Sequence, residues 1–307
     1  MKFSLVSKVL ISAALASSAS AFAPNQNRKT AIRSIEKTSP STQSRDAPVT
    51  PPPQSFFGTP SHLLAQSNET EEGFFSNLTI NPIYAAFYLV FFSVATYMTT
   101  TEASGASQVL VEKFIADPLH PGFGSSLFES VWNDIGLVGL PLATLIMPGA
   151  KGQKFNPTPF LFASSLAGFG SLGIFMMTRS PAPSVKKEDL GWFTKNVLEN
   201  KIFNWVLFAV LANAYLISGA ANGIFLDPAG LLSEFKDMIG GSALGLTTTV
   251  DFAILCLTGA SLVPEDLKRR GFVDDGKANA IAASTLLFPA AGLALYSALR
   301  PSLDDSE

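Results

Sequence analysis

The chain has one cysteine, Cys256, and only two histidines among its 307 residues. A single cysteine excludes an intrachain disulfide and a metal site built on thiolates. His120 has no second metal-type residue at a suitable spacing, so we predict no metal site. Cys256 lies inside an apolar stretch, where a free cysteine behaves as a small hydrophobic residue.

Charged residues are also scarce. Asp, Glu, Lys and Arg make up 15% of the chain, against about 25% in soluble proteins. The net charge of −3, without a cluster of Lys and Arg on a soluble stretch, argues against nucleic acid as a partner. Glycine-rich nucleotide loops, HExxH, GxSxG after a strand and acidic calcium loops are missing too. We therefore assign no catalytic residue, although an enzyme that uses scattered polar residues remains an alternative.

The chain does contain long apolar segments. Hydrophobic residues make up 47% of it, and they gather in segments of about 18 to 22 residues, long enough to cross a bilayer. We predict an all-α polytopic membrane helix bundle of about six transmembrane helices within residues 66–303. The predicted spans are 83–98, 128–147, 160–177, 202–220, 243–262 and 280–299.

The N-terminal segment has the features of a targeting sequence. Lys2 and Lys8 precede an apolar centre that ends in Ala19-Ser20-Ala21, which predicts a signal peptide over residues 1–21. Residues 22–65, rich in Ser, Thr and Pro with an excess of basic side chains, are predicted to be a disordered transit peptide. An ordinary secretory signal followed by a Pro-rich linker is the alternative, and the glycosylation patterns at Asn68 and Asn77 lean toward it.

Asp251 is the one formal charge in the apolar run from Ala243 to Leu262. A charge near the bilayer centre costs at least about 2.5–3.5 kcal/mol, so we expect Asp251 to have a polar partner. Thr247 and Thr248 share its helix face. The partners available on other spans are Asn213, Asn204, Tyr215 and Asp134. Three hypotheses stay open: a structural hydrogen bond between helices, a substrate or pigment contact, and a proton relay with Asp134.

The basic residues set the predicted topology. Lys268, Arg269 and Arg270 follow the fifth span and are predicted to be a stromal basic anchor. With six spans, ten Lys and Arg fall on one side, predicted to be the stroma, and four on the other, which places both termini on the lumenal or intermembrane side. The ten are Lys113, Arg179, Lys186, Lys187, Lys195, Lys201, Lys268, Arg269, Arg270 and Lys277; the four are Lys151, Lys154, Lys236 and Arg300. The sequence shows no tandem repeat of fixed period and no inverted pair.

Several segments resemble known families. The junction Ala19-Ser20-Ala21-Phe22-Ala23-Pro24 resembles the two-part plastid presequence of algae with red-type secondary plastids, such as diatoms. The segments 132–175, 250–271 and 284–303 resemble a family of multispanning proteins of uncharacterised function from cyanobacteria and chloroplasts. Members often carry a histidine or another polar residue shortly before the aspartate, where this chain has Thr247 to Thr249. The C-terminal layout is also similar to that of the neoxanthin synthase family of carotenoid enzymes. These resemblances imply a plastid membrane, either the thylakoid or the inner envelope.

The expected function follows from targeting, composition and missing motifs. We expect a structural, assembly or accessory component of a photosynthetic membrane complex, in contact with membrane lipids and membrane-protein partners. The alternative is a membrane enzyme or carrier for a lipid-soluble substrate such as a carotenoid. No cofactor is assigned, although contacts with pigment or lipid fit either function.

Overall fold

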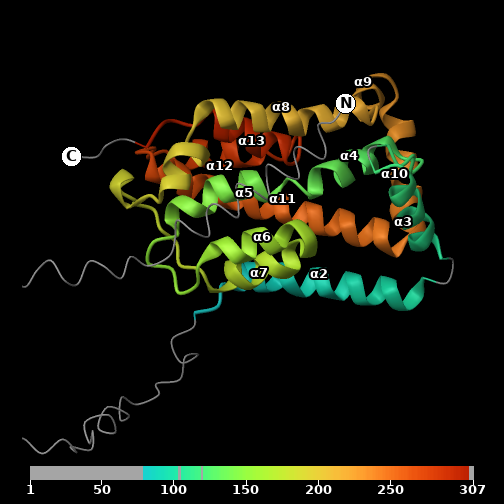
Figure 1. The fold of residues 1–307 in the computed structure, drawn as a ribbon, viewed down its shortest axis with the longest axis horizontal. Coiled ribbons are helices and arrows are strands. Elements are labelled where there is room, and N and C mark those ends of the chain that lie inside the picture. The colour runs from blue at the N-terminus through green and yellow to red at the C-terminus, as the bar shows by residue number, and fades with distance from the viewer. Residues whose placement is uncertain (1–78, 103–104, 119, 304–307) are drawn as a thin grey trace, which may run out of the picture. The chain divides into compact units, whose positions relative to one another are not determined.

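The computed structural model describes residues 79–102, 105–118 and 120–303, and this part of the chain is helical without a strand (Figure 1). The predicted signal and transit peptides, together with residues 66–78, lie outside the described residues. Two helices, α2 and α11, are long and apolar enough to cross a membrane. Two bent helix pairs pass the same test, so the number of spans rises to four if each pair counts as one.

Helix α11 (Ala243–Arg269) is the central helix, and α2, α4, α5 and α12 pack against it. The side chain of Ser242 caps its first turn by accepting a hydrogen bond from the Gly245 N–H at 3.1 Å. Its 27 residues make about 40 Å of helix, more than the roughly 30 Å of a hydrocarbon core. The predicted span 243–262 is thus one continuous helix, which carries its last turns beyond the apolar run.

Three other predicted spans also correspond to helices or bent helix pairs. Helix α2 (Pro82–Thr101) begins at the Asn81 cap and covers the predicted span 83–98. The span 128–147 is α4 (Ser126–Ile135) followed by α5 (Gly139–Ile146) and a 3-10 turn (Met147–Gly149), with a bend of 46°. The span 202–220 is α8 (Lys201–Ile217) with α9 (Ala220–Leu226), bent by 67°.

The third predicted span, 160–177, is wrong: this segment is a helical hairpin of α6 (Pro157–Ala167) and α7 (Phe169–Thr178). The rings of Phe160 and Phe175 lie 5.9 Å apart, whereas a straight helix would separate them by about 22 Å. At the open end, the Ser180 N–H donates to the Gln153 side chain at 2.9 Å. The segment therefore enters and leaves at the same end of the bundle, as a re-entrant loop does.

The sixth predicted span, 280–299, is wrong for the same reason. It consists of α12 (Asp275–Ser284) and α13 (Ala291–Leu299), joined by an irregular turn. Asp275 pairs with Lys268 at 3.0 Å and Arg300 pairs with Asp266 at 3.1 Å, so both ends of the hairpin lie beside the last turns of α11. The turn itself reaches into the bundle, where the Tyr215 hydroxyl donates to the Pro289 carbonyl at 3.0 Å.

The order of elements occurs twice along the chain, a structural repeat that the sequence did not reveal. In each half a helix leads away from one end, a short helix lies at the other end, a second helix returns, and a hairpin follows. The first half is α2, α3 (Ala106–Ala116), α4 with α5, and α6 with α7; the second is α8 with α9, α10 (Pro228–Gly241), α11, and α12 with α13. The short helix α9 has no counterpart among the described residues of the first half. The packing repeats as well. Helix α2 contacts the last helix of its own half, α7, and the returning helix of the other half, α11; α8 makes the equivalent contacts with α13 and α4. The halves are parallel, separated by about 120 residues, as in carriers whose halves are related by an axis along the membrane normal.

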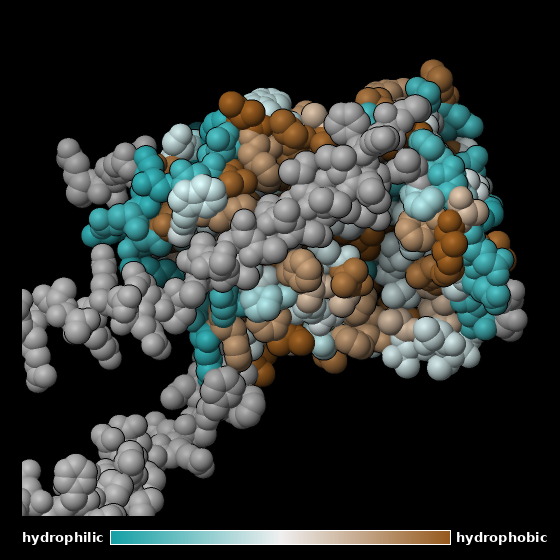
Figure 2. Space-filling view, viewed as in Figure 1, coloured by the Kyte–Doolittle hydropathy of each residue, from teal (hydrophilic) through white to brown (hydrophobic). Residues whose placement is uncertain are grey.

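Because the two hairpins reverse the chain, most basic residues lie at one end of the bundle. We call it the basic end and define it by Arg179, Arg269, Arg270 and Arg300. Of fourteen Lys and Arg in the described residues, only Lys113 and Lys236 lie at the opposite end. Relative to the six-span prediction, Lys151, Lys154 and Arg300 join the larger group and Lys113 leaves it, so the division changes from ten against four to twelve against two. Figure 2 shows hydrophilic residues at both ends of the visible face and apolar residues between them. By the positive-inside rule the basic end, with residues 79 and 303, would lie on the untranslocated side, opposite to the side predicted for the termini from six spans.

Cysteine labelling distinguishes this topology from six spans. In a Cys256→Ser background, we expect Lys154→Cys to react with an impermeant maleimide from the same side as Lys186→Cys, because both flank the first hairpin at its open end. Lys236→Cys is the control for the opposite end, and all three positions are exposed. If Lys154→Cys reacted from the same side of the membrane as Lys236→Cys, residues 160–177 would have to cross the membrane, and the hairpin would be contradicted.

Candidate functional site: a cavity beside two aspartates

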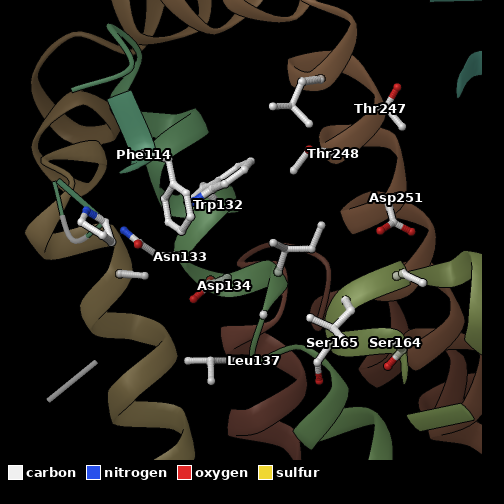
Figure 3. Close-up of a pocket in the computed structure, with 18 of the residues that line it drawn as sticks. Phe114, Trp132, Asn133, Asp134, Leu137, Ser164, Ser165, Thr247, Thr248 and Asp251 are labelled. Atoms are coloured by element: carbon white, nitrogen blue, oxygen red, sulfur yellow. The ribbon is translucent and has the colours of Figure 1, made fainter. Parts of the chain in front are cut away.

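A cavity of about 930 Å³ lies between α4, α6, α8 and α11 (Figure 3). Its size falls in the range of small-molecule sites, about 300–1,000 Å³. Its wall is mainly apolar, with a few polar groups. The lining residues include Phe91, Phe114, His120, Trp132, Asn133, Asp134, Gly136, Leu137, Ser164, Ser165, Gly168, Asn213, Thr247, Thr248 and Asp251.

Asp251 lies where α11 meets the tip of the first hairpin. Its Oδ1 atom accepts a hydrogen bond from the Phe169 N–H at 2.7 Å, and Phe169 is the first residue of α7. The start of a helix has N–H groups without partners inside the helix, and such groups are costly in an apolar environment. Asp251 therefore caps a helix that begins inside the bundle. The partner is a backbone group, and not one of the side chains that the sequence suggested.

Gly168 makes this contact possible. Its φ of 54° and ψ of −139° belong to a region that is essentially reserved for glycine. A Cβ atom at position 168 would also overlap the Asp251 carboxylate. Reversal of the chain between α6 and α7 thus depends on a residue without a side chain.

Asp134 is the other carboxylate at the cavity wall. It is 0% exposed, and neither of its oxygens has a hydrogen-bond partner among the described residues. In the repeated element order, α4 with α5 occupies the place of α11, so Asp134 and Asp251 hold corresponding positions in the two halves. A buried carboxylate without a partner is costly, and such groups concentrate at functional sites.

The remaining polar residues predicted within spans divide into two sets. Thr247 and Thr248 lie one turn before Asp251 on α11 and line the cavity with Asn213 of α8. Tyr215 does not line the cavity, since it points to the second hairpin and binds Pro289. The structure thus brings Asp134, Asp251, Asn213 and both threonines to one cavity, while Tyr215 stabilises the neighbouring hairpin.

A network of buried ion pairs lies at the basic end, apart from the cavity. Asp266 is 0% exposed and accepts hydrogen bonds from Arg270 Nε at 3.0 Å, Arg300 Nη1 at 3.1 Å and the Tyr296 hydroxyl at 2.7 Å. Glu199 binds both arginines, at 2.9 Å each. This network joins the end of α11 to the start of α8 and the end of α13.

A second group of ion pairs secures the first hairpin. Arg179 follows α7 and pairs with Glu265 at 2.6 Å, while Arg269 also binds Glu265 and donates to the Leu145 carbonyl at 2.8 Å. The basic residues predicted to anchor the end of the span, Lys268, Arg269 and Arg270, do follow the apolar run of α11, but two of the three are buried in ion pairs. The side chains of Arg269 and Arg270 are 1% exposed, and only Lys268, at 48%, faces outward.

The acidic partners Glu265 and Asp266 were not predicted, although their spacing to the arginines is a signal for them. Glu265 with Arg269 and Asp266 with Arg270 are four residues apart, the spacing at which opposite charges meet on a helix. Burial alone lowers the pKa of Arg270, but the carboxylates of Asp266 and Glu199 offset this and leave its pKa raised. Arg270 therefore stays charged, and its partners must remain ionised for the network to hold.

Comparisons with known protein families, with curated proteins and with solved structures give no match to this chain. Among the described residues, no group of three or more His, Cys, Asp or Glu side chains is arranged to hold a metal ion.

Proposed function

We propose that this chain is an integral membrane protein that binds a lipid-soluble molecule in the cavity beside Asp134 and Asp251, as a carrier or as a membrane enzyme. The buried, unpartnered carboxylate of Asp134 at the wall of a cavity of about 930 Å³ carries this proposal. Irregular backbone at membrane depth supports it, because broken helices inside a bilayer are tolerated where they are enclosed by protein or line a cavity. Parallel structural halves are a further feature that carriers share.

We place the protein in a plastid membrane, the thylakoid or the inner envelope. The proposal rests on the Ala19-Ser20-Ala21-Phe22-Ala23-Pro24 junction and the transit-like segment 22–65. The lipid-soluble pigments and quinones of such membranes are the class of molecules that a cavity of this size and apolar character can accept. Carotenoids belong to this class.

Filling the cavity is expected to remove its ligand without unfolding the protein. Gly136 lines the cavity, and a Cβ at this position would meet no atom within 4 Å. We expect Gly136→Phe to retain the fold and to lose at least about 80% of the lipid-soluble material that co-purifies with the wild type, because one aromatic ring occupies a large part of a drug-sized site. Mass spectrometry of organic extracts from equal amounts of purified protein provides the measurement.

Gly240→Phe is the matched control, since Gly240 lies on α10 outside the cavity and also has open space at its Cβ. Equal co-purified material in the wild type and both variants would contradict a ligand in this cavity. It would favour a second candidate, an accessory subunit of a photosynthetic membrane complex. That role draws support from α2, whose apolar window is only 6% buried and could face a partner helix. Migration with a large assembly on native gels would then be expected.

A further inference from the structure

We infer that the molecule held in this cavity is a lipophilic organic cation, or carries a cationic group at one end. The inference rests on the proposed function and narrows its ligand from lipid-soluble molecules in general to those that carry a positive charge, which neutral carotenoids and quinones do not. It is built on the charges that surround the cavity, the direction of two helices that end at its wall, and its aromatic side chains.

The formally charged side chains at the wall are acidic, and His120 is the one other ionisable group among its described lining residues. Asp134 and Asp251 both line the cavity, and no Lys or Arg is among its described lining residues. Asp251 uses Oδ1 to cap α7, while its Oδ2 atom accepts no hydrogen bond from the described residues. Asp134 has no partner for either oxygen. A cation in the cavity would compensate two carboxylates that the protein itself leaves without a basic partner.

Two helices present their C-terminal ends to the same cavity. The last turn of α6, residues 164–168, and the last turn of α4, residues 133–136, both belong to its wall. The C-terminal end of a helix carries unpaired carbonyls and the negative end of the helix dipole. In transporters with broken helices, such ends coordinate cations. The start of α7 also lies at this wall and is the positive end of a helix dipole, but Asp251 Oδ1 caps it. The two helix C-termini and the carboxylate oxygens without a hydrogen-bond partner therefore contribute the uncompensated, negative part of the potential.

The shape and lining of the cavity favour an organic cation over a bare metal ion. A volume of about 930 Å³ far exceeds the space of a single ion, and the described residues contain no metal-type cluster. Phe91, Phe114 and Trp132 contribute aromatic walls, with the rings of Phe114 and Trp132 only 5.2 Å apart. Aromatic faces attract organic cations, most strongly where water is excluded.

Two ions of the same shape and opposite charge test this inference. Tetraphenylphosphonium and tetraphenylborate differ mainly in the sign of their charge. We expect the full chain in phosphatidylcholine nanodiscs, measured by equilibrium dialysis against empty nanodiscs, to bind tetraphenylphosphonium at least about tenfold more tightly than tetraphenylborate. Asp251→Asn keeps an oxygen that can accept from the Phe169 N–H. It is expected to weaken cation binding about tenfold and to leave anion binding unchanged.

Asp134→Asn is a second variant with the same expected effect, and Asp237→Asn, at an exposed position on α10, is the control that should change nothing. If the wild type bound both ions equally and Gly136→Phe bound neither, the inference of a cationic ligand would be overturned, but the proposal of a ligand in this cavity would be supported. Binding of neither ion above the level of empty nanodiscs, together with unchanged co-purified material in Gly136→Phe, would overturn the proposed function as well.

Discussion

Gly168→Ala is expected to destabilise the protein by about 3–5 kcal/mol, one of the two largest effects that a single substitution should have here. Alanine is strained at the backbone angles of Gly168, and its Cβ would overlap the Asp251 carboxylate. If Asp251 moves aside, the Phe169 N–H loses its acceptor inside the bundle. Thermal unfolding of the detergent-purified protein should show a midpoint lower by about 10 °C.

Gly240→Ala is the matched control, because Gly240 has an ordinary helical backbone and open space at its Cβ. This variant should be as stable as the wild type or up to about 1 kcal/mol more stable. In a double-mutant cycle, Asp251→Ala should cost much less in the Gly168→Ala background than in the wild type, because the two positions are in direct contact. Additive effects would show that the two positions do not meet at the hairpin tip.

Asp266→Ala is expected to cost about 3–5 kcal/mol, because it removes the shared acceptor of two buried arginines. Arg270 and Arg300 would keep only Glu199 as an acidic partner, and the Tyr296 hydroxyl would lose its acceptor. The ends of α8, α11 and α13 would then separate more easily. Chemical or thermal unfolding of purified protein measures the loss, which should change little with salt since the pairs are buried.

Asp275→Ala breaks the exposed pair with Lys268 and provides the comparison. The side chains of Lys268 and Asp275 are 48% and 69% exposed, so the change should stay within about 0.5 kcal/mol. Similar small losses in both variants would mean that Asp266 is accessible to water and that the network does not bind the three helix ends together.

The number of consecutive apolar residues correctly predicted the two long helices. The span 83–98 lies within α2 and the span 243–262 lies within α11, because about 20 apolar residues with few charges favour a membrane helix wherever they occur. The all-helical class follows from the same pattern. Asp251 was singled out for its cost in an apolar segment, and the structure indeed places it at the cavity together with Asp134, Asn213, Thr247 and Thr248.

Residues 160–177 and 280–299 show where the same argument fails. Each is apolar and long enough to cross a bilayer. Hydropathy, however, identifies an apolar segment and its length, and does not show whether the chain reverses within that segment. The first segment reverses at Gly168 because Asp251, 82 residues away from Phe169, satisfies the N–H group that the reversal exposes. Arg270 likewise reads as part of a basic anchor in the sequence, but in the structure it is buried beside Glu199, which arrives from a segment 71 residues away.

The helical class, the apolar segments and the residues that are costly to bury could all be predicted, because they depend on local composition and spacing. Which apolar segments reverse, which charges are buried and which polar residues share a cavity became evident only from the folded chain. These outcomes depend on the pairing of groups far apart in the chain, because a hydrogen bond or ion pair in an apolar environment is favourable only when its partner arrives from another helix.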